Sequence, residues 1–130
     1  MTAAEMSGAA CAPNLSFGAR RLRARVARVM GAVAVVALVA TIGVAAPWWV
    51  RGGVVFAAAL VAAIGFFEAR ASVCIVAAAQ GVYEDDGRRK TPMEATLLPA
   101  IRRAAGTIVG KAVLVALAAG SIATLTSLVR

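Results

Sequence analysis

Three long apolar stretches, residues 29–46, 52–67 and 112–129, divide this 130-residue chain, and basic residues are crowded into alternate gaps between them. A helix rises about 1.5 Å per residue, so each stretch covers most of a hydrocarbon core about 30 Å thick. The pattern therefore predicts an integral membrane protein with three transmembrane segments.

The composition favours lipid, or other helices, as the solvent of these segments. The chain is 62% apolar but only 5% aromatic, so it lacks the large side chains that fill a water-soluble core. No stretch shows the alternation of a barrel strand, and inside a bilayer helices satisfy the backbone polar groups. We expect an all-α membrane protein.

The uneven distribution of basic residues predicts an orientation. Positive residues favour the cytoplasmic face, which places the N-terminus inside and the C-terminus outside a bacterial inner membrane, either cytoplasmic or intracytoplasmic. Topology and anionic lipids account for these charges without nucleic acid. The predicted cytoplasmic residues are Arg20, Arg21, Arg23, Arg25 and Arg28 before the first stretch, and Arg88, Arg89, Lys90, Arg102 and Arg103 between the second and third.

Proline and tryptophan mark the predicted outer connection. Pro47 ends the first helix, Trp48 and Trp49 suit the membrane interface, and Arg51 is a third anchor, so the first two spans form a tight hairpin. The predicted segments are an N-terminal tail without a stable element (1–18), a basic juxtamembrane helix (19–28), transmembrane helices (29–46, 52–70 and 104–129), the outer loop (47–51) and a cytoplasmic helix-turn-helix segment (71–103).

Within the cytoplasmic segment, residues 71–82 are expected to continue as a helix along the interface, followed by a charged turn. Thr91 and Glu94 fit a capping box that would start the next helix. Pro99 would either kink that helix or restart it.

Chemistry-bearing residues are scarce. The chain has no histidine, and its two cysteines, Cys11 and Cys74, are far apart. Imidazole ligation, a catalytic triad and a C-x-x-C motif are thus all excluded. We expect that this chain is not an enzyme and that it ligates no metal or cofactor, although it would contact lipid or the pigment of a partner.

Three charged residues, Arg28, Glu68 and Lys111, are predicted at similar depth near the cytoplasmic ends of the three spans. Glu68 could pair with either cation. An ionisable residue inside a membrane is also a functional hypothesis, because small proton-coupled transporters often depend on one carboxylate.

Small residues recur at helix-packing spacing in the third span. Gly106 and Gly110 form a G-x-x-x-G motif, and Ala116 and Gly120 repeat the spacing. Such pairs allow close approach of another helix.

From residue 20 to residue 81 the order of features resembles a small bacterial inner-membrane domain of unknown function that is sometimes fused to rhodanese domains. The matching features are the arginines, Gly31 in an apolar helix, a short loop, a second helix, and then Cys74 and Gly81. Ile75 stands where that family usually has proline. The resemblance implies a helical hairpin rather than an activity.

Two functions remain open. The first is a non-catalytic accessory subunit that packs against integral membrane proteins of a larger complex, respiratory or photosynthetic in kind. The alternative is a small oligomeric transporter or channel that uses Glu68.

Overall fold

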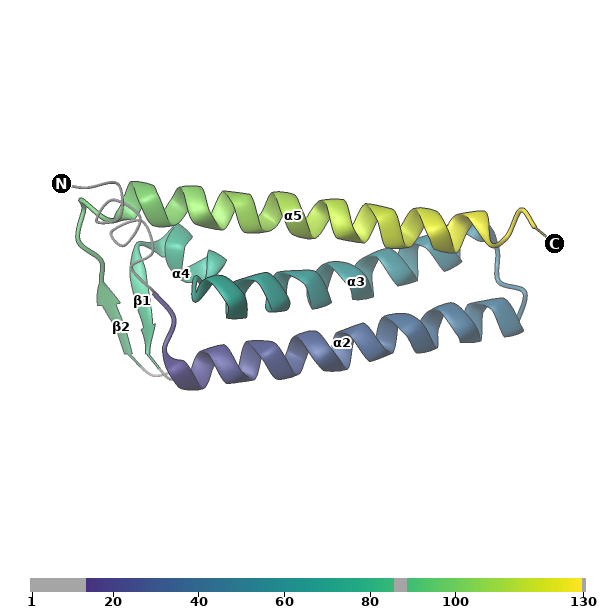
Figure 1. Cartoon of the computed structure of the whole chain (residues 1–130), viewed down its shortest axis with the longest axis horizontal. Helices are drawn as coiled ribbons and strands as arrows, with labels where there is room; N and C mark the ends of the chain where they lie inside the picture. Colours follow the sequence, from purple (N-terminus) through teal and green to yellow (C-terminus); the bar gives the residue numbers. More distant parts are fainter. Residues whose placement is uncertain (1–13, 86–88, 130) are drawn as a thin grey trace.

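The computed structural model describes residues 14–85 and 89–129 and consists mainly of three long helices. The helices α2 (Phe17–Gly43), α3 (Trp48–Ala71) and α5 (Leu98–Leu125) run side by side along the long axis of the molecule (Figure 1). All three are long and apolar enough to cross a membrane. The expected helical membrane architecture is therefore present as far as helix length and composition define it.

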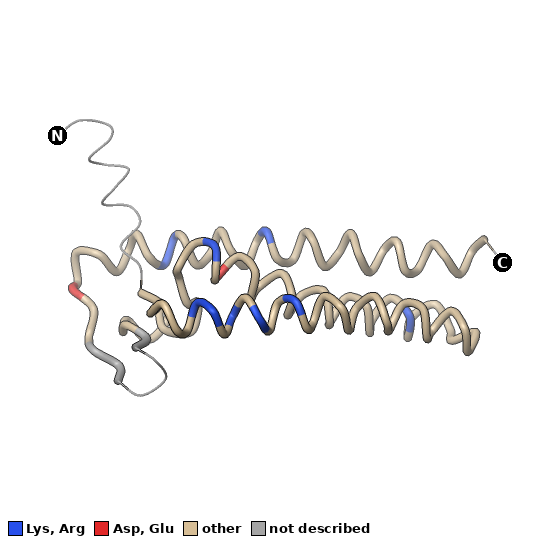
Figure 2. Tube along the Cα trace, turned by 60° about the horizontal axis from the view of Figure 1, so that its bottom comes forward, with Lys and Arg blue, Asp and Glu red and all other residues tan. Residues whose placement is uncertain are grey.

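Helix α3 is the central helix of this bundle. It packs extensively against both α2 and α5, and Figure 1 shows it between them. Successive helices are antiparallel, so the start of α2 and the connection from α3 to α5 lie at one end. We call this the inner end, because it carries most of the basic residues (Figure 2). The end that holds the α2–α3 loop and the last turn of α5 is the outer end.

The helix boundaries differ from the predicted ones by a few residues. Helix α2 begins at Phe17, because the hydroxyl of Ser16 accepts a hydrogen bond from the backbone N–H of Ala19 at 3.3 Å. The basic segment and the first span therefore form one helix. Helix α3 begins at Trp48, so the residues predicted as the end of the outer loop belong to its first turn. The predicted tail lies outside the described residues up to position 13.

Small side chains bring the helices together. Ala112 and Ala116 are fully buried against the rest of the bundle, and a Cβ added to Gly120 would lie 3.3 Å from the carbonyl oxygen of Gly52 on α3. At the α2–α3 contact, a Cβ on Gly65 would lie 3.1 Å from the carbonyl oxygen of Arg23. Close backbone approach between helices in lipid favours such residues. The predicted packing role of Ala116 and Gly120 therefore corresponds to a contact inside the chain.

The inner end differs most from the predicted helix-turn-helix segment. Helix α4 (Ile75–Gln80) is short and ends at Gly81, whose φ of 69° favours glycine. The strands β1 (Val82–Asp85) and β2 (Arg89–Pro92) then pair antiparallel. Their register sets Glu84 opposite Lys90 and Asp85 opposite Arg89.

The predicted capping box is wrong. Thr91 belongs to β2, and α5 begins only at Leu98, with Pro99 in its first turn. The two charged segments pair as antiparallel strands instead of forming a free turn. The proline restarts the helix, which was one of its two predicted roles.

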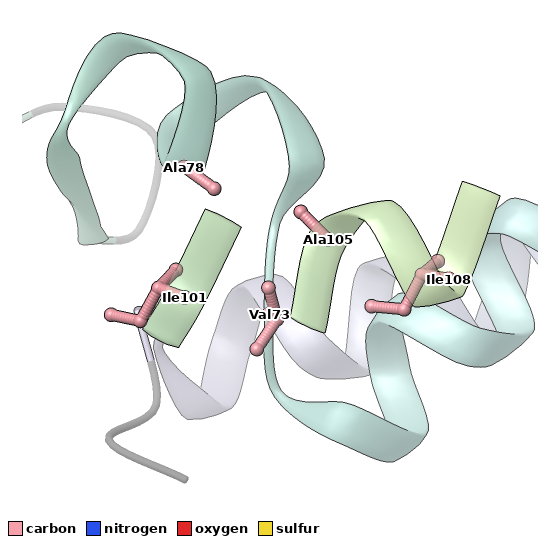
Figure 3. Packing of buried hydrophobic residues seen from close by; sticks show 5 residues of the cluster. All are labelled: Val73, Ala78, Ile101, Ala105 and Ile108. Atoms are coloured by element: carbon pink, nitrogen blue, oxygen red, sulfur yellow. The ribbon is translucent and has the colours of Figure 1, made fainter. Parts of the chain in front are cut away.

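A compact apolar cluster fixes α4 to the start of α5. Its buried members are Val73, Ala78, Ile101, Ala105 and Ile108, which come from the α3–α4 connection, α4 and α5 (Figure 3). Arg102 adds polar contacts, because its guanidinium donates to the carbonyl oxygens of Ala78 and Ala79 in the last turn of α4. The cluster holds the inner end in one arrangement relative to the long helices.

Candidate functional site

The most deeply buried charge of the described chain is Glu68, in the last turns of α3. It is 2% exposed. One carboxylate oxygen, Oε1, accepts a hydrogen bond from the backbone N–H of Ile75 at 2.8 Å. The other, Oε2, lies 3.4 Å from Nε of Arg23 on α2 and makes no hydrogen bond within the described residues. Glu68 therefore joins three segments: α2, α3 and the start of α4.

A tight reversal of the backbone brings Ile75 to this carboxylate. Ser72 ends α3 in the left-handed conformation, with φ 55°, and its N–H donates to the carbonyl oxygen of Glu68. The N–H of Val73 donates to the same oxygen at 3.2 Å. The chain thus folds back over the helix end, and the first N–H group of α4 points toward a negative charge, an arrangement that helix N-termini favour.

Asn14 closes the reversal from the other side. Its side chain, 1% exposed, accepts from the N–H of Cys74 at 2.7 Å and donates to the carbonyl oxygen of Cys74 at 3.2 Å. Its own backbone N–H donates to the carbonyl oxygen of Ser72. Cys74 itself is buried and not in a disulfide, and its Sγ lies 3.5 Å from a guanidinium nitrogen of Arg23. We call Asn14, Arg23, Glu68, Cys74 and the N–H of Ile75 the inner polar cluster.

The cation that pairs with Glu68 is therefore not one of the two that the sequence suggested. Arg28 is exposed, and its Nε donates to the carbonyl oxygen of Ala24 on its own helix. Lys111 is exposed on α5. The close approach of Gly65 to the backbone of Arg23 sets the register of α2 against α3, and this register brings Arg23, one turn before Arg28, level with Glu68.

At the outer end, Arg51 is buried rather than placed at an exposed interface. It is 3% exposed, and its guanidinium donates to the carbonyl oxygens of Thr41 and Ala46 and to the hydroxyl of Thr126. The carbonyls belong to the end of α2 and its loop, and Thr126 caps α5. Arg51 thus ties the outer ends of all three helices. Trp48 and Trp49, beside it, are more than half exposed, as expected of interface residues.

The four small residues predicted for helix packing divide into two pairs. Ala116 and Gly120 face α3. Gly106 and Gly110 are exposed, and a Cβ added to either would meet nothing within 4 Å. At 100° per residue Gly106 and Gly110 lie about 120° and 160° around α5 from the buried Ala112. The G-x-x-x-G motif is therefore unused by the described chain.

The polar groups of these two ends hold segments of the chain in place relative to one another. No group of three or more metal-ligating side chains occurs within the described ranges. The carboxylate and the guanidinium groups are engaged with backbone groups or with each other.

The chain was compared with protein-family models, with curated proteins and with solved structures, and none of them matches it. The resemblance of residues 20–81 to the rhodanese-associated domain stays a prediction.

Sequence reasoning missed three features: the role of Asn14, the pairing of Glu68 with Arg23, and the burial of Arg51. Asn14 lies in a small-residue segment without periodicity, and its contact spans 60 positions. Arg51 carried a signal: it is a lone arginine between two apolar stretches, and an isolated cation there needs carbonyl partners when it is buried.

Proposed function

We propose that this protein is a non-catalytic accessory subunit that packs against other integral membrane proteins of a larger complex. The observation that carries the proposal is the outer face of α5, defined by Gly106, Gly110, Leu114, Leu117 and Ser121. Its two glycines form the G-x-x-x-G motif that lets two helices approach closely in lipid. Nothing in the described chain approaches that motif.

The shape of this face supports a helix as its partner. Leu114 and Leu117, which are 68% and 51% exposed, continue this face one to two turns beyond the flat strip that the glycines leave. Toward the outer end the face continues into a groove of about 550 Å³ between α3 and α5. Leu117 and Ser121 line it from α5, and Trp48, Gly52 and Phe56 line it from α3. Glycines beside projecting leucines are typical of transmembrane helix contacts.

One pair of small residues packs within the chain and the other pair does not. Ala116 and Gly120 contact α3, which supports the use of Gly106 and Gly110 for the same kind of contact with another chain. The absence of histidine supports a role without catalysis and without a cofactor ligated by this chain.

The location that goes with this role is a bacterial inner membrane, with the inner end cytoplasmic. The asymmetry of Lys and Arg between the two ends supports that orientation (Figure 2). The host that we propose is a respiratory or photosynthetic assembly. In such an assembly this chain would contact the lipid or pigment of its partners.

The alternative function, a small oligomeric transporter or channel that uses Glu68, has one observation in its favour. Oε2 of Glu68 is buried and makes no hydrogen bond within the described residues, and a buried carboxylate inside a membrane is typical of ion-coupled transport. Its neighbours favour a structural role, since Arg23 pairs with Oε2 and the N–H of Ile75 donates to Oε1.

The proposed contact is tested by filling the strip that Gly106 and Gly110 leave open. We expect Gly106→Leu/Gly110→Leu to migrate as a smaller species than the native protein after extraction in a mild detergent, with its helical circular dichroism and thermal stability unchanged. The reason is that both positions are open in the chain but would obstruct a close helix.

Gly43→Leu is the matched control, because Gly43 also meets nothing within 4 Å but lies on α2. It should leave the size of the complex unchanged. A native protein that is itself monomeric in mild detergent, or a double variant that stays in the complex, would contradict the proposal.

A further inference from the structure

A long groove where α2 and α3 meet combines arginines with an apolar floor. It has a volume of about 990 Å³ and runs between α2 and α3, with Val115 of α5 at one edge. Arg20, Arg21 and Arg28 line it from α2, and Arg70 lines it from α3. Alanine, glycine and phenylalanine residues of the two helices line the rest. We call it the arginine groove.

The positive charges of this groove gather at its inner end. Arg20, Arg21 and Arg70 lie at the ends of their helices that meet there, and all three are exposed. The guanidinium of Arg21 lies 4.6 Å from the ring centre of Phe17, which holds it at the rim. Arg28 begins deeper, but its Nε is turned back one helical turn to the carbonyl of Ala24. Its charge is therefore also directed toward the inner end.

No carboxylate neutralises these arginines within the part of the chain that the structure describes. The ion pair found there joins Arg23 to Glu68, and neither of those residues lines the groove. The result is a local excess of four positive charges above a surface of alanine, glycine and phenylalanine. A ligand that matches this surface is anionic at one end and apolar along the rest.

The length of the apolar part selects a lipid tail. From Ala24 to Ala34 the groove follows α2 for about 15 Å at 1.5 Å per residue, which is half of a hydrocarbon core about 30 Å thick. One leaflet of a bilayer has that depth. The arginines then lie at the level of the head groups, where basic residues attract anionic lipids.

We propose that the arginine groove is a binding site for one anionic phospholipid of the cytoplasmic leaflet. Arg20, Arg21 and Arg70 hold the phosphate head group, Arg28 reaches up to it, and one acyl chain lies on Ala59, Ala62 and Ala63. The site lies apart from the outer face of α5 and does not depend on a protein partner there. The bound lipid would fill the gap between α2 and α5 over the central helix.

The proposal is tested by native mass spectrometry of the full chain in detergent, titrated with phosphatidylglycerol or with phosphatidylcholine. We expect one phosphatidylglycerol to be retained at least tenfold more tightly than phosphatidylcholine. Each basic residue near the membrane surface strengthens binding of anionic lipid by a factor of about five. The variant Arg20→Gln/Arg21→Gln/Arg70→Gln should therefore weaken retention of phosphatidylglycerol by tenfold to about a hundredfold.

The matched control removes the same charge outside the groove, with Arg25→Gln/Arg103→Gln/Lys111→Gln. All three residues are exposed, and none lines the groove. The control should change retention less than threefold. Equal losses in both variants, or equal retention of the two lipids, would overturn the proposal, since attraction would then be spread over the whole surface or come from the tails alone.

Two further experiments distinguish a bound phospholipid from free phosphate and from a protein helix in the groove. Inorganic phosphate at the same concentration should not displace the lipid, and displacement would overturn the acyl-chain contact. A photoreactive amino acid at Ala62 should gain the mass of a lipid when it is irradiated in membranes. Crosslinking there to a protein would mean that a helix fills the groove, which would also overturn the proposal.

Discussion

Replacing Glu68 with alanine is expected to lower the free energy of unfolding by about 2–4 kcal/mol in mixed detergent micelles. The carboxylate is buried, and its loss leaves the N–H of Ile75 without an acceptor and Arg23 without its anion. Removal of one partner from a buried ion pair costs about 3–5 kcal/mol, and the partial exposure of Arg23 reduces that figure.

The isosteric change Glu68→Gln removes the charge but keeps the hydrogen bond. The amide oxygen can still accept from Ile75, so the free energy of unfolding should fall by about half as much as in Glu68→Ala. Glu94→Ala, which removes an exposed carboxylate, should change stability by less than about 0.5 kcal/mol. Equal stability of the Glu68→Ala and Glu94→Ala variants would contradict the structural role. Proton flux in liposomes that Glu68→Gln abolishes without a loss of stability would instead favour the transporter.

Replacing Arg51 with alanine is expected to have the second large effect, a loss of about 2–3 kcal/mol. The change removes the donors to Thr41, Ala46 and Thr126 together and leaves the backbone carbonyls at the end of α2 without their partner. Because Arg51 is the link between α2 and α5 at the outer end, hydrogen exchange should also rise selectively in the last turn of α5.

Arg51→Lys tests whether the geometry of the guanidinium matters. A single ammonium group cannot reproduce the planar fork that reaches three acceptors on different segments, so an intermediate loss is expected. Arg25→Ala, an exposed arginine on α2, provides the control and should be nearly neutral. A lysine variant as stable as the native protein would show that charge alone suffices. No change in Arg51→Ala would contradict the tie between the helices.

The three long helices could be predicted because they depend on the length of apolar runs, which is a local property of the sequence. Pro47 located the loop between α2 and α3 to within a few residues. The short loop at Pro47 predicted that the ends of α2 and α3 lie together, since antiparallel neighbours with short connections leave few alternatives. The small residues Ala116 and Gly120 were correctly assigned to helix packing.

The contacts of the inner polar cluster could not be predicted, because they depend on the register between helices. Glu68 had several cations within a turn of its expected depth, and only the close contact at Gly65 selects Arg23. The pairing of β1 with β2 replaced a predicted turn and capped helix, because two short charged segments carry no local apolar periodicity from which strands could be predicted. The sequence also could not separate the glycines that face outward from the small residues that face α3.

Site-specific photocrosslinking in native membranes tests for the proposed protein partner on the outer face of α5. A photoreactive amino acid at Gly110 should form a covalent adduct with a different integral membrane protein, whereas one at Gly43 on α2 should not form that adduct. Adducts of the Gly110 position with lipid alone, or with a second copy of this chain, would contradict the proposed accessory role.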